Sequence, residues 1–248
     1  MKKLEIKIVA ILAMLLFIFV LLITSFEVAI YGDKNYQFYE KEYEKYDVLK
    51  DLDMEMKEVM KVTSYMMDYL RGREQELSIE TKVEGVEQDF FNEQDRLHMA
   101  DVQNLFLKGL LFRNVAVGLC ILLLLFLLYK KAKLRTLLPK AFGISFLIIV
   151  IISGIIGSLF YHDFTKYFTI FHEIFFTNDL WLFDYDTDYM IRMLPEGFFN
   201  DFLVRIGVVF SLFLIGTMVL FGILFFLPGY KFTKPGNCGK LLKDKDPN

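Results

Sequence analysis

Four long apolar stretches dominate this chain of 248 residues, and each is long enough to cross a lipid bilayer. A membrane core about 30 Å thick needs roughly 20 consecutive apolar residues in a helix. The stretches run from Ile8 to Tyr31, Leu105 to Leu128, Ala141 to Tyr161 and Ile206 to Leu227. The whole chain is 55% hydrophobic, which excludes an ordinary water-soluble domain. The sequence therefore predicts a mainly α-helical, polytopic membrane protein with four transmembrane helices.

The distribution of charge predicts the orientation of these helices. Lysine and arginine gather before the first stretch, between the second and third, and in the C-terminal tail. Because short basic segments stay in the cytoplasm, we expect both termini to be cytoplasmic and the protein to be a multi-pass protein of the cell membrane. The two remaining segments, 32–104 and 162–203, are then extracytoplasmic. Both are acidic, with 19 Asp and Glu against 10 Lys and Arg in the first and 8 against 2 in the second.

The resulting organisation has eight parts. We expect transmembrane helices at 1–31, 105–129, 141–161 and 204–228, an extracytoplasmic cap with the start of the second helix at 32–104, a basic cytoplasmic loop at 130–140, a second extracytoplasmic loop at 162–203 and a cytoplasmic tail at 229–248. Glu27 occupies a position where signal-peptide cleavage would need a small residue, so the first helix is expected to be retained. No basic patch suits nucleic acid, and we expect no such partner.

The cap is expected to be a small α+β domain. Apolar residues recur at helical spacing from Met56 to Leu70, with Asp51 or Asp53 as the expected N-cap and Gly72 as the stop. Apolar and polar residues then alternate between 77 and 83, as in a short strand, and Gly85 would turn the chain.

Three further features concern the helices near the membrane. Asn92 is a suitable N-cap for a long helix that continues into the second span. The aromatic run 165–176 predicts a helix lying in the membrane interface. Pro195 suits the first turn of the last helix. Cys120, inside a span, and Cys238, in the tail, cannot pair easily.

The three histidines of the chain all lie where a span meets an extracytoplasmic segment: His98, His162 and His172. Histidine can both accept and donate a proton near neutral pH, so this placement indicates proton transfer at the membrane surface. His98 and Asp101, three residues apart, share one face of a helix. The spacing alone favours solvated interfacial histidines at positions 98 and 162, and it leaves the structural and functional interpretations of His172 equally open. A zinc site formed by His98, Asp101 and a distant histidine is a second alternative, but no H-E-x-x-H motif supports it.

Two segments resemble a known family. The string from Phe90 to Val102 contains the pattern F…E…H-M-x-D-V, and the segment from Phe171 to Phe199 includes Asn178 and Trp181. Both resemble the corresponding segments of a bacterial four-span membrane family that includes the lipoprotein intramolecular transacylases.

The resemblance implies a specific reaction. A fatty acyl chain would move from the sn-2 oxygen of an S-diacylglyceryl-cysteine lipoprotein to the α-amino group of the same cysteine, giving a lyso-form lipoprotein. By motif, the two catalytic histidines of the family fall on His98 and His172, whereas His162 matches no catalytic position. One imidazole would act as base and the other as acid, without a cofactor or a metal.

Supporting roles complete the hypothesis. Asp101 would orient or balance the charge of an imidazolium, Arg113 or Asn178 would stabilise the oxyanion, and Trp181 belongs to the matching loop. The expected partners are diacylated lipoproteins and membrane lipid, and the expected state is a monomer. The alternatives are a non-enzymatic membrane sensor or scaffold with an acidic cap, and a metal-dependent membrane hydrolase.

Overall fold

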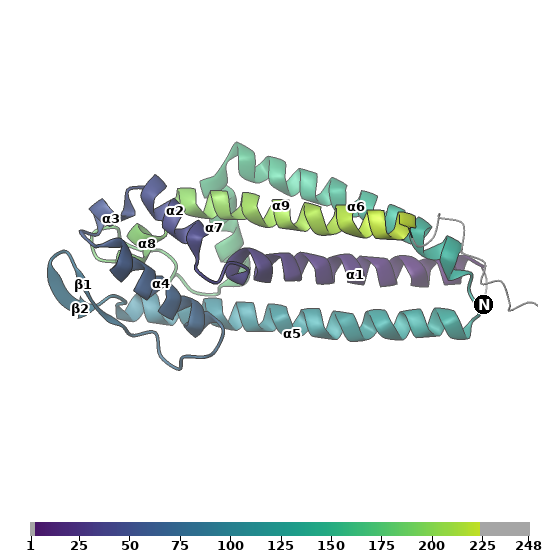
Figure 1. The fold of residues 1–248 in the computed structure, drawn as a ribbon, viewed down its shortest axis with the longest axis horizontal. Coiled ribbons are helices and arrows are strands. Elements are labelled where there is room, and N and C mark those ends of the chain that lie inside the picture. Colours follow the sequence, from purple (N-terminus) through teal and green to yellow (C-terminus); the bar gives the residue numbers. More distant parts are fainter. Residues whose placement is uncertain (1–2, 224–248) are drawn as a thin grey trace, which may run out of the picture.

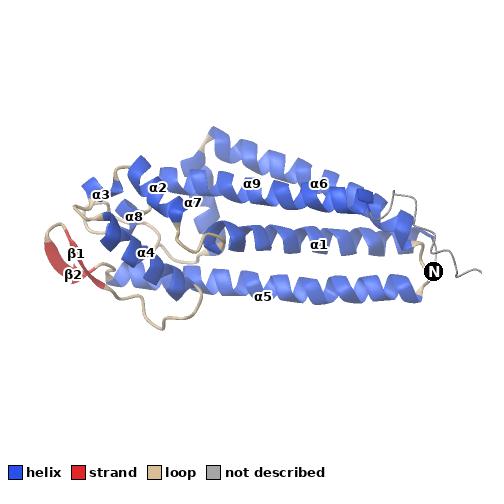
Figure 2. Cartoon of the chain, in the orientation of Figure 1, coloured by secondary structure: helices blue, strands red, loops and turns tan. Residues whose placement is uncertain are grey.

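The computed structural model describes residues 3–223, and helices make up most of this part of the chain (Figure 2). Its elements are α1 (Lys3–Tyr31), α2 (Gln37–Lys45), α3 (Val48–Asp51), α4 (Met56–Leu70), β1 (Glu80–Val83), β2 (Val86–Asp89), α5 (Glu93–Tyr129), α6 (Leu134–His162), α7 (Phe164–Phe175), α8 (Tyr189–Met193) and α9 (Glu196–Phe221).

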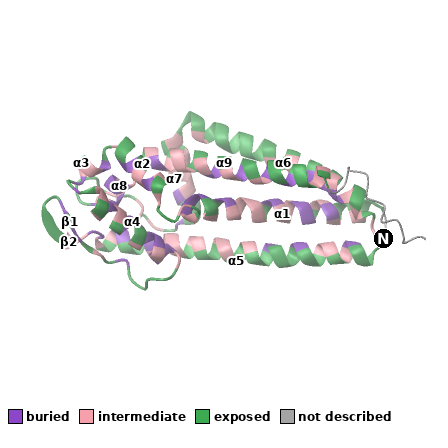
Figure 3. Cartoon of the chain, viewed as in Figure 1, coloured by how far each residue is buried: buried purple, intermediate pink, exposed green. Residues whose placement is uncertain are grey.

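Four of these helices, α1, α5, α6 and α9, are long and apolar enough to cross a membrane, which confirms the predicted fold class. They run side by side as a bundle, and the remaining elements gather at one end as a cap (Figure 1). Helix α1 contacts the other three. Most side chains along the bundle are exposed or half-buried, as expected of helices that lipid surrounds (Figure 3).

Small residues let the neighbours of α1 approach it closely. Ala10 and Ala13 are fully buried. The Cys120 thiol of α5 donates to the Ala13 carbonyl oxygen at 3.4 Å, and the Ser145 hydroxyl of α6 donates to the Ile11 carbonyl oxygen at 3.3 Å. Small side chains and interhelical hydrogen bonds of this kind stabilise helix contacts in membranes.

Two of the long helices begin earlier than the expected spans. Helix α6 starts at Leu134, within the segment expected to be a cytoplasmic loop, because its apolar residues already face the bundle: Leu138 and Ala141 are buried. Helix α9 starts at Glu196 with Pro195 as its N-cap, at the position the proline indicated. The end of the fourth expected span and the expected tail at 229–248 lie outside the described residues, as does Cys238.

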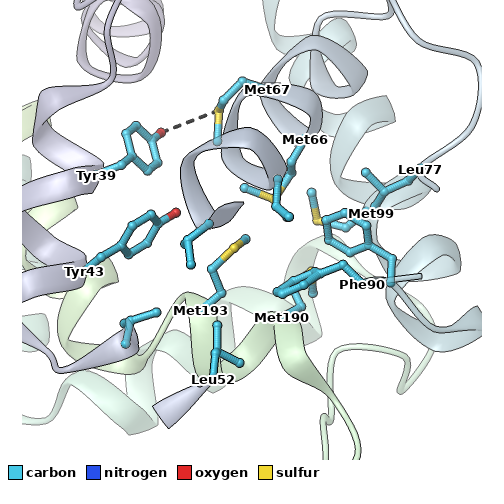
Figure 4. Packing of buried hydrophobic residues seen from close by; sticks show 14 of the residues in the cluster. Tyr39, Tyr43, Leu52, Met66, Met67, Leu77, Phe90, Met99, Met190 and Met193 are labelled. Carbon is cyan, nitrogen blue, oxygen red and sulfur yellow. Dashed lines mark hydrogen bonds between the residues drawn. The ribbon is translucent and has the colours of Figure 1, made fainter. Parts of the chain in front are cut away.

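The cap has its own hydrophobic core, to which α2, α3, α4, α8 and the start of α5 contribute (Figure 4). Aromatic residues and methionines dominate it, and the Tyr43 hydroxyl forms a 2.7 Å hydrogen bond with the Thr63 hydroxyl inside it. Arg192 of α8 forms ion pairs with Glu84, at 2.7 Å, and with Asp51, at 3.5 Å. The segment between α6 and α9 is thereby fastened to the segment between α1 and α5.

The α+β prediction for the cap is right in its main elements. Helix α4 ends in a Schellman motif, in which Gly72 has φ +72° and the Arg73 amide donates to the Asp68 carbonyl oxygen. Gly85, at φ +77°, turns the chain from β1 into the antiparallel strand β2.

The predicted N-cap of α4 was wrong. Asp51 belongs to the short helix α3, and Asp53 has a left-handed backbone with φ 48°. Between these aspartates Leu52 is fully buried, so the chain turns into the core before α4 begins. Glu55 occupies the N-cap without a side-chain hydrogen bond.

The start of α5 agrees with the prediction and has the strongest cap of the bundle helices in the described residues. The Asn92 side chain accepts from the Asp95 amide at 2.9 Å, and the Asp95 carboxylate accepts from the Asn92 amide at 3.0 Å, forming a capping box. Asn92 also donates to the Asp188 carboxylate. This residue therefore secures both the helix and the second loop.

Replacing Asn92 with alanine should lower the free energy of unfolding by about 1–2 kcal/mol, because the first turn of α5 loses its cap. The thermal midpoint of the detergent-solubilised protein measures this change. Asn35→Ala, at an exposed position of the cap, is the matched control and should leave the midpoint unchanged. Equal midpoints for the two variants would contradict the role of Asn92.

Candidate active site

His98 lies in the first turns of α5, on the part of the helix that precedes the expected span. Its side chain is turned into the protein, and the residue is only 5% exposed. The rings of Phe176 and Phe183 pack against the imidazole edge-on, with centroids 5.1 and 5.3 Å away. Its Nδ1 atom is buried and has no hydrogen-bond partner among the described residues. His98 is therefore a buried residue, although its spacing on the helix would also allow a solvated surface position.

His172 lies in the last turn of α7, a helix that crosses the bundle at its cap end (Figure 1). The residue is 8% exposed. Its Nδ1 atom lies 2.7 Å from the Phe168 carbonyl oxygen one turn earlier. The Trp181 indole stacks on the imidazole at 4.9 Å, and the Phe168 ring meets it edge-on at 4.4 Å.

The two imidazoles are neighbours. Their ring centroids are 6.0 Å apart and their planes are inclined by 30°. Phe176 touches both rings, at 5.1 Å from His98 and 5.5 Å from His172. The structure thus brings together two histidines that are 74 positions apart in the sequence, inside a pocket of aromatic side chains.

Burial keeps both imidazoles neutral. It lowers the pKa of His98 to about 4, an effect to which neighbouring His172 adds and which the Asp101 carboxylate opposes. Burial also lowers the pKa of His172, and the Phe168 carbonyl oxygen partly offsets this by accepting from the ring. Because a carbonyl oxygen can only accept, Nδ1 of His172 carries the proton, and its Nε2 is left with a free lone pair.

Asp101 and Asn178 meet beside the pair. The Asn178 amide donates to the Asp101 carboxylate at 2.9 Å, and the Asn178 backbone carbonyl oxygen accepts from the Trp181 indole at 2.9 Å. Asp101 is therefore connected to the ring that stacks on His172. The side-chain amide of Asn178 is thus bound to Asp101, and the Trp181 ring holds the His172 imidazole in place.

The loop that carries these residues is pinned to the start of α5. The Gln94 side chain donates to the carbonyl oxygens of Leu180, at 3.1 Å, and Leu182, at 2.9 Å. The Asn92 contact with Asp188 holds the far end of the same loop. The part of the loop that carries Trp181 and Phe183 is thus held by hydrogen bonds from Gln94 near its start and from Asn92 at its end.

A small cavity adjoins the histidines on the side of the bundle. It has a volume of about 160 Å³. Its lining joins one face of α5 to the end of α7 and the following turn: Asp101, Asn104, Leu105, Lys108, Phe175, Phe176, Thr177 and Asn178. Phe176 lines the cavity and also contacts both imidazoles, so the cavity and the histidine pair share this residue.

Two residues considered in the sequence lie elsewhere. Arg113 is 15 residues beyond His98 on α5, roughly 22 Å further along the helix, and its guanidinium forms an ion pair with Glu27 of α1. The structure therefore does not bring Arg113 to the histidines as an oxyanion stabiliser. His162 is exposed at the end of α6.

Sequence reasoning missed the contacts that hold the imidazoles: the Phe168 carbonyl oxygen, the Phe183 ring and the pinning by Gln94. A backbone carbonyl carries no residue signature, and phenylalanine is too frequent here to single one out. The helical spacing of Phe168 and His172 was the available signal. Within residues 3–223, no group of three or more His, Cys, Asp or Glu side chains is arranged to hold a metal ion.

The buried, neutral state of His98 predicts a pH dependence of stability. Between pH 6.5, the ordinary histidine value, and about 4, the unfolded chain binds a proton at this residue and the folded chain does not. Stability should therefore be fully present above pH 6.5 and fall as the pH drops toward 4, by roughly 3 kcal/mol.

The thermal midpoint measured from pH 7 to pH 4 tests this, with His98→Phe as the matched variant. That variant keeps an aromatic ring but cannot titrate, so its midpoint should fall less steeply. If the thermal midpoints of the two proteins fell in parallel with pH, the titration of buried His98 would not be the cause of the lost stability.

Comparison with known proteins relates this geometry to a family. The family model described as lipoprotein intramolecular transacylase Lit matches residues 11–199. This range includes His98 and His172, the cap, α5, α6 and most of α1. No curated protein matches the chain by sequence.

Solved structures share the fold. The lipoprotein intramolecular transacylase Lit from Bacillus cereus superposes with a TM-score of 0.66 at 20% identity, over 90% of this chain and 95% of that chain. A variant of the same protein with one histidine replaced by alanine gives a TM-score of 0.65 at 20% identity, over 89% of this chain and 92% of that chain. At this level of identity, these superpositions establish the architecture.

Proposed function

Because this chain belongs to the lipoprotein intramolecular transacylase family, we propose that its reaction moves the sn-2 acyl chain of an S-diacylglyceryl-cysteine lipoprotein to the α-amino group of the same cysteine. The protein is an acyltransferase that modifies lipoproteins, and it is a multi-pass membrane protein. The observation that carries the proposed mechanism is the buried pair formed by His98 and His172, with ring centroids 6.0 Å apart.

The proposed reaction is balanced without water or a second substrate. A bond forms between the α-amino nitrogen and the acyl carbonyl carbon, and the bond from that carbon to the sn-2 oxygen breaks. One proton leaves the amine, and one proton arrives on the glyceryl oxygen. The product is an N-acyl, S-monoacylglyceryl lipoprotein, the lyso form.

His172 is suited to act as the base. An α-amino group has a pKa near 8 and must lose a proton to attack. His172 directs its proton-bearing Nδ1 at the Phe168 carbonyl oxygen, which leaves Nε2 free to accept. The lowered pKa of His172 ensures that the ring is neutral, and so able to accept, at pH 7.

His98 is suited to act as the donor. The attacking nitrogen and the departing oxygen are bonded to the same carbon in the tetrahedral intermediate, so two neighbouring imidazoles can serve both. A neutral ring N–H of His98 can hydrogen-bond to the developing oxyanion. The proton that His172 takes from the amine then passes to the glyceryl oxygen as the C–O bond breaks, which returns both imidazoles to the neutral state. Asp101, connected through Asn178 to Trp181, positions the His172 ring and opposes the drop in the pKa of His98.

The surroundings favour transfer over hydrolysis. Aromatic rings of Phe168, Phe176, Phe183 and Trp181 enclose the imidazoles, which limits the access of water to the ester. Since donor and acceptor belong to one molecule, the main task of the protein is to hold them close. Such positioning alone can lower a barrier by about 7–11 kcal/mol when the geometry is optimal.

The topology that accompanies this proposal places the cap and the histidines outside the cell membrane and both termini in the cytoplasm. The basic residues between α5 and α6 lie at the end of the bundle opposite the acidic cap (Figure 1), as the orientation of membrane proteins requires. The partners are diacylated lipoproteins and membrane lipid, and the working unit is a monomer, because one chain supplies both histidines.

Replacing either His98 or His172 with alanine should reduce conversion of a diacylglyceryl lipoprotein to its lyso form by at least roughly 100-fold, because each change removes a proton-transfer group. Mass spectrometry of the N-terminal lipopeptide measures the product. His162→Ala, which removes the exposed histidine, is the control and should retain most of the activity. Full conversion by a folded His98 or His172 variant would overturn the mechanism.

A further inference from the structure

A second, larger cavity lies on the face of α5 opposite the smaller cavity. Its volume is about 380 Å³. It is lined by the outer end of α1, the end of α4 with the turn that follows, and the middle of α5: Glu27, Tyr31, Leu70, Arg71, Arg73, Phe106 and Leu110. Phe106 and Leu110 are each two residues from Lys108 of the smaller cavity, which is 200° around an α-helix. The two cavities are therefore separate.

The charges around this cavity do not cancel. Glu27 is neutralised by its ion pair with Arg113, and Arg73 forms an ion pair with Asp68 at 2.9 Å. Arg71 has no carboxylate partner among the described residues. Its guanidinium lies over the Tyr31 ring, 3.8 Å from the centroid. The other two arginines of segment 32–104, Arg73 and Arg96, form ion pairs with Asp68 and Asp89.

A second observation also indicates a polar ligand. The Tyr31 hydroxyl is buried in the same wall beside the Arg71 guanidinium, and its proton has no acceptor among the described residues. Buried hydroxyls normally have a partner, because an unsatisfied polar group is unfavourable. A small adjustment of the Tyr31 side chain would let it donate to an anion held by Arg71.

The remaining lining is apolar. Leu70, Phe106 and Leu110 form the apolar side of the cavity. Phe106 and Leu110 belong to the expected span 105–129, and Glu27 and Tyr31 belong to the expected span 1–31. A ligand with an anionic head and an acyl tail would therefore place the head beside Arg71 and the tail along α1 and α5.

We propose that this cavity binds the phosphate of an anionic phospholipid, with the Arg71 guanidinium as its principal ligand. Arginine binds phosphate through two parallel N–H donors, and cationic pockets at the ends of membrane helices bind lipid headgroups in this way. Because the cavity is formed jointly by α1, α4 and α5, the headgroup fastens the cap to the bundle. The inference does not depend on the proposed reaction, since the cavity contains neither histidine.

Native mass spectrometry of the full-length protein in a non-ionic detergent tests the proposal. Three probes are compared: dioleoylphosphatidylglycerol, zwitterionic dioleoylphosphatidylcholine and inorganic phosphate. Phosphatidylglycerol should bind more tightly than phosphatidylcholine and raise the thermal midpoint. Arg71→Gln should weaken its binding by about ten-fold, as loss of a charge-assisted pair does.

Lys57→Gln, which removes the same charge from an exposed position of α4, is the matched control and should bind phosphatidylglycerol like the unaltered protein. Retained binding in a folded Arg71→Lys variant, at intermediate strength, would support recognition by the planar guanidinium. Displacement of the lipid by millimolar inorganic phosphate would identify the phosphate group itself as the recognised chemistry. Equal phosphatidylglycerol binding by Arg71→Gln and Lys57→Gln would overturn the proposal.

Discussion

The architecture depends on one uninterrupted helix that passes from the membrane into the cap. Helix α5 has 37 residues, a length of about 55 Å, whereas the apolar core of a bilayer is about 30 Å thick. The excess raises His98 and Asp101 above the expected span on a rigid support. The capping box at Asn92 secures the end of this support, and the loop that follows α7 is fastened along it. The cap, the loop and His98, the proposed proton donor, are thus all held by the same helix.

Burial is the physical property that makes the histidine pair useful. Two exposed imidazoles would be partly protonated near neutral pH, and the charged form cannot accept a proton. In this pocket the pKa values of both rings are lowered, so both are neutral where an amine must be deprotonated. The Phe168 carbonyl oxygen then selects the tautomer of His172, and in the proposed mechanism this tautomer makes His172 the base. In the proposed mechanism, the same aromatic walls that lower these pKa values would also limit hydrolysis of the ester.

Much of the fold could be predicted from the sequence, because a membrane leaves few solutions for long apolar segments. The four long helices, the Asn92 cap and the Gly72 stop follow from local patterns. The site was harder to predict. Spacing alone allowed His98 to be a surface residue, and its pairing with His172 came from a family resemblance. The ion pair of Arg113 with Glu27 could not be predicted, because it requires knowing which level of α1 lies beside α5.

The central claim is that the acyl chain moves within a single lipoprotein molecule. The most direct test mixes two diacylglyceryl lipopeptides of different peptide mass, one of which carries a deuterated chain at sn-2, and analyses the products by mass spectrometry. Intramolecular transfer predicts that the deuterated chain is found only on the α-amino group of its own peptide. Deuterated chains on the other peptide, or an N-acyl chain drawn from sn-1, would contradict the account.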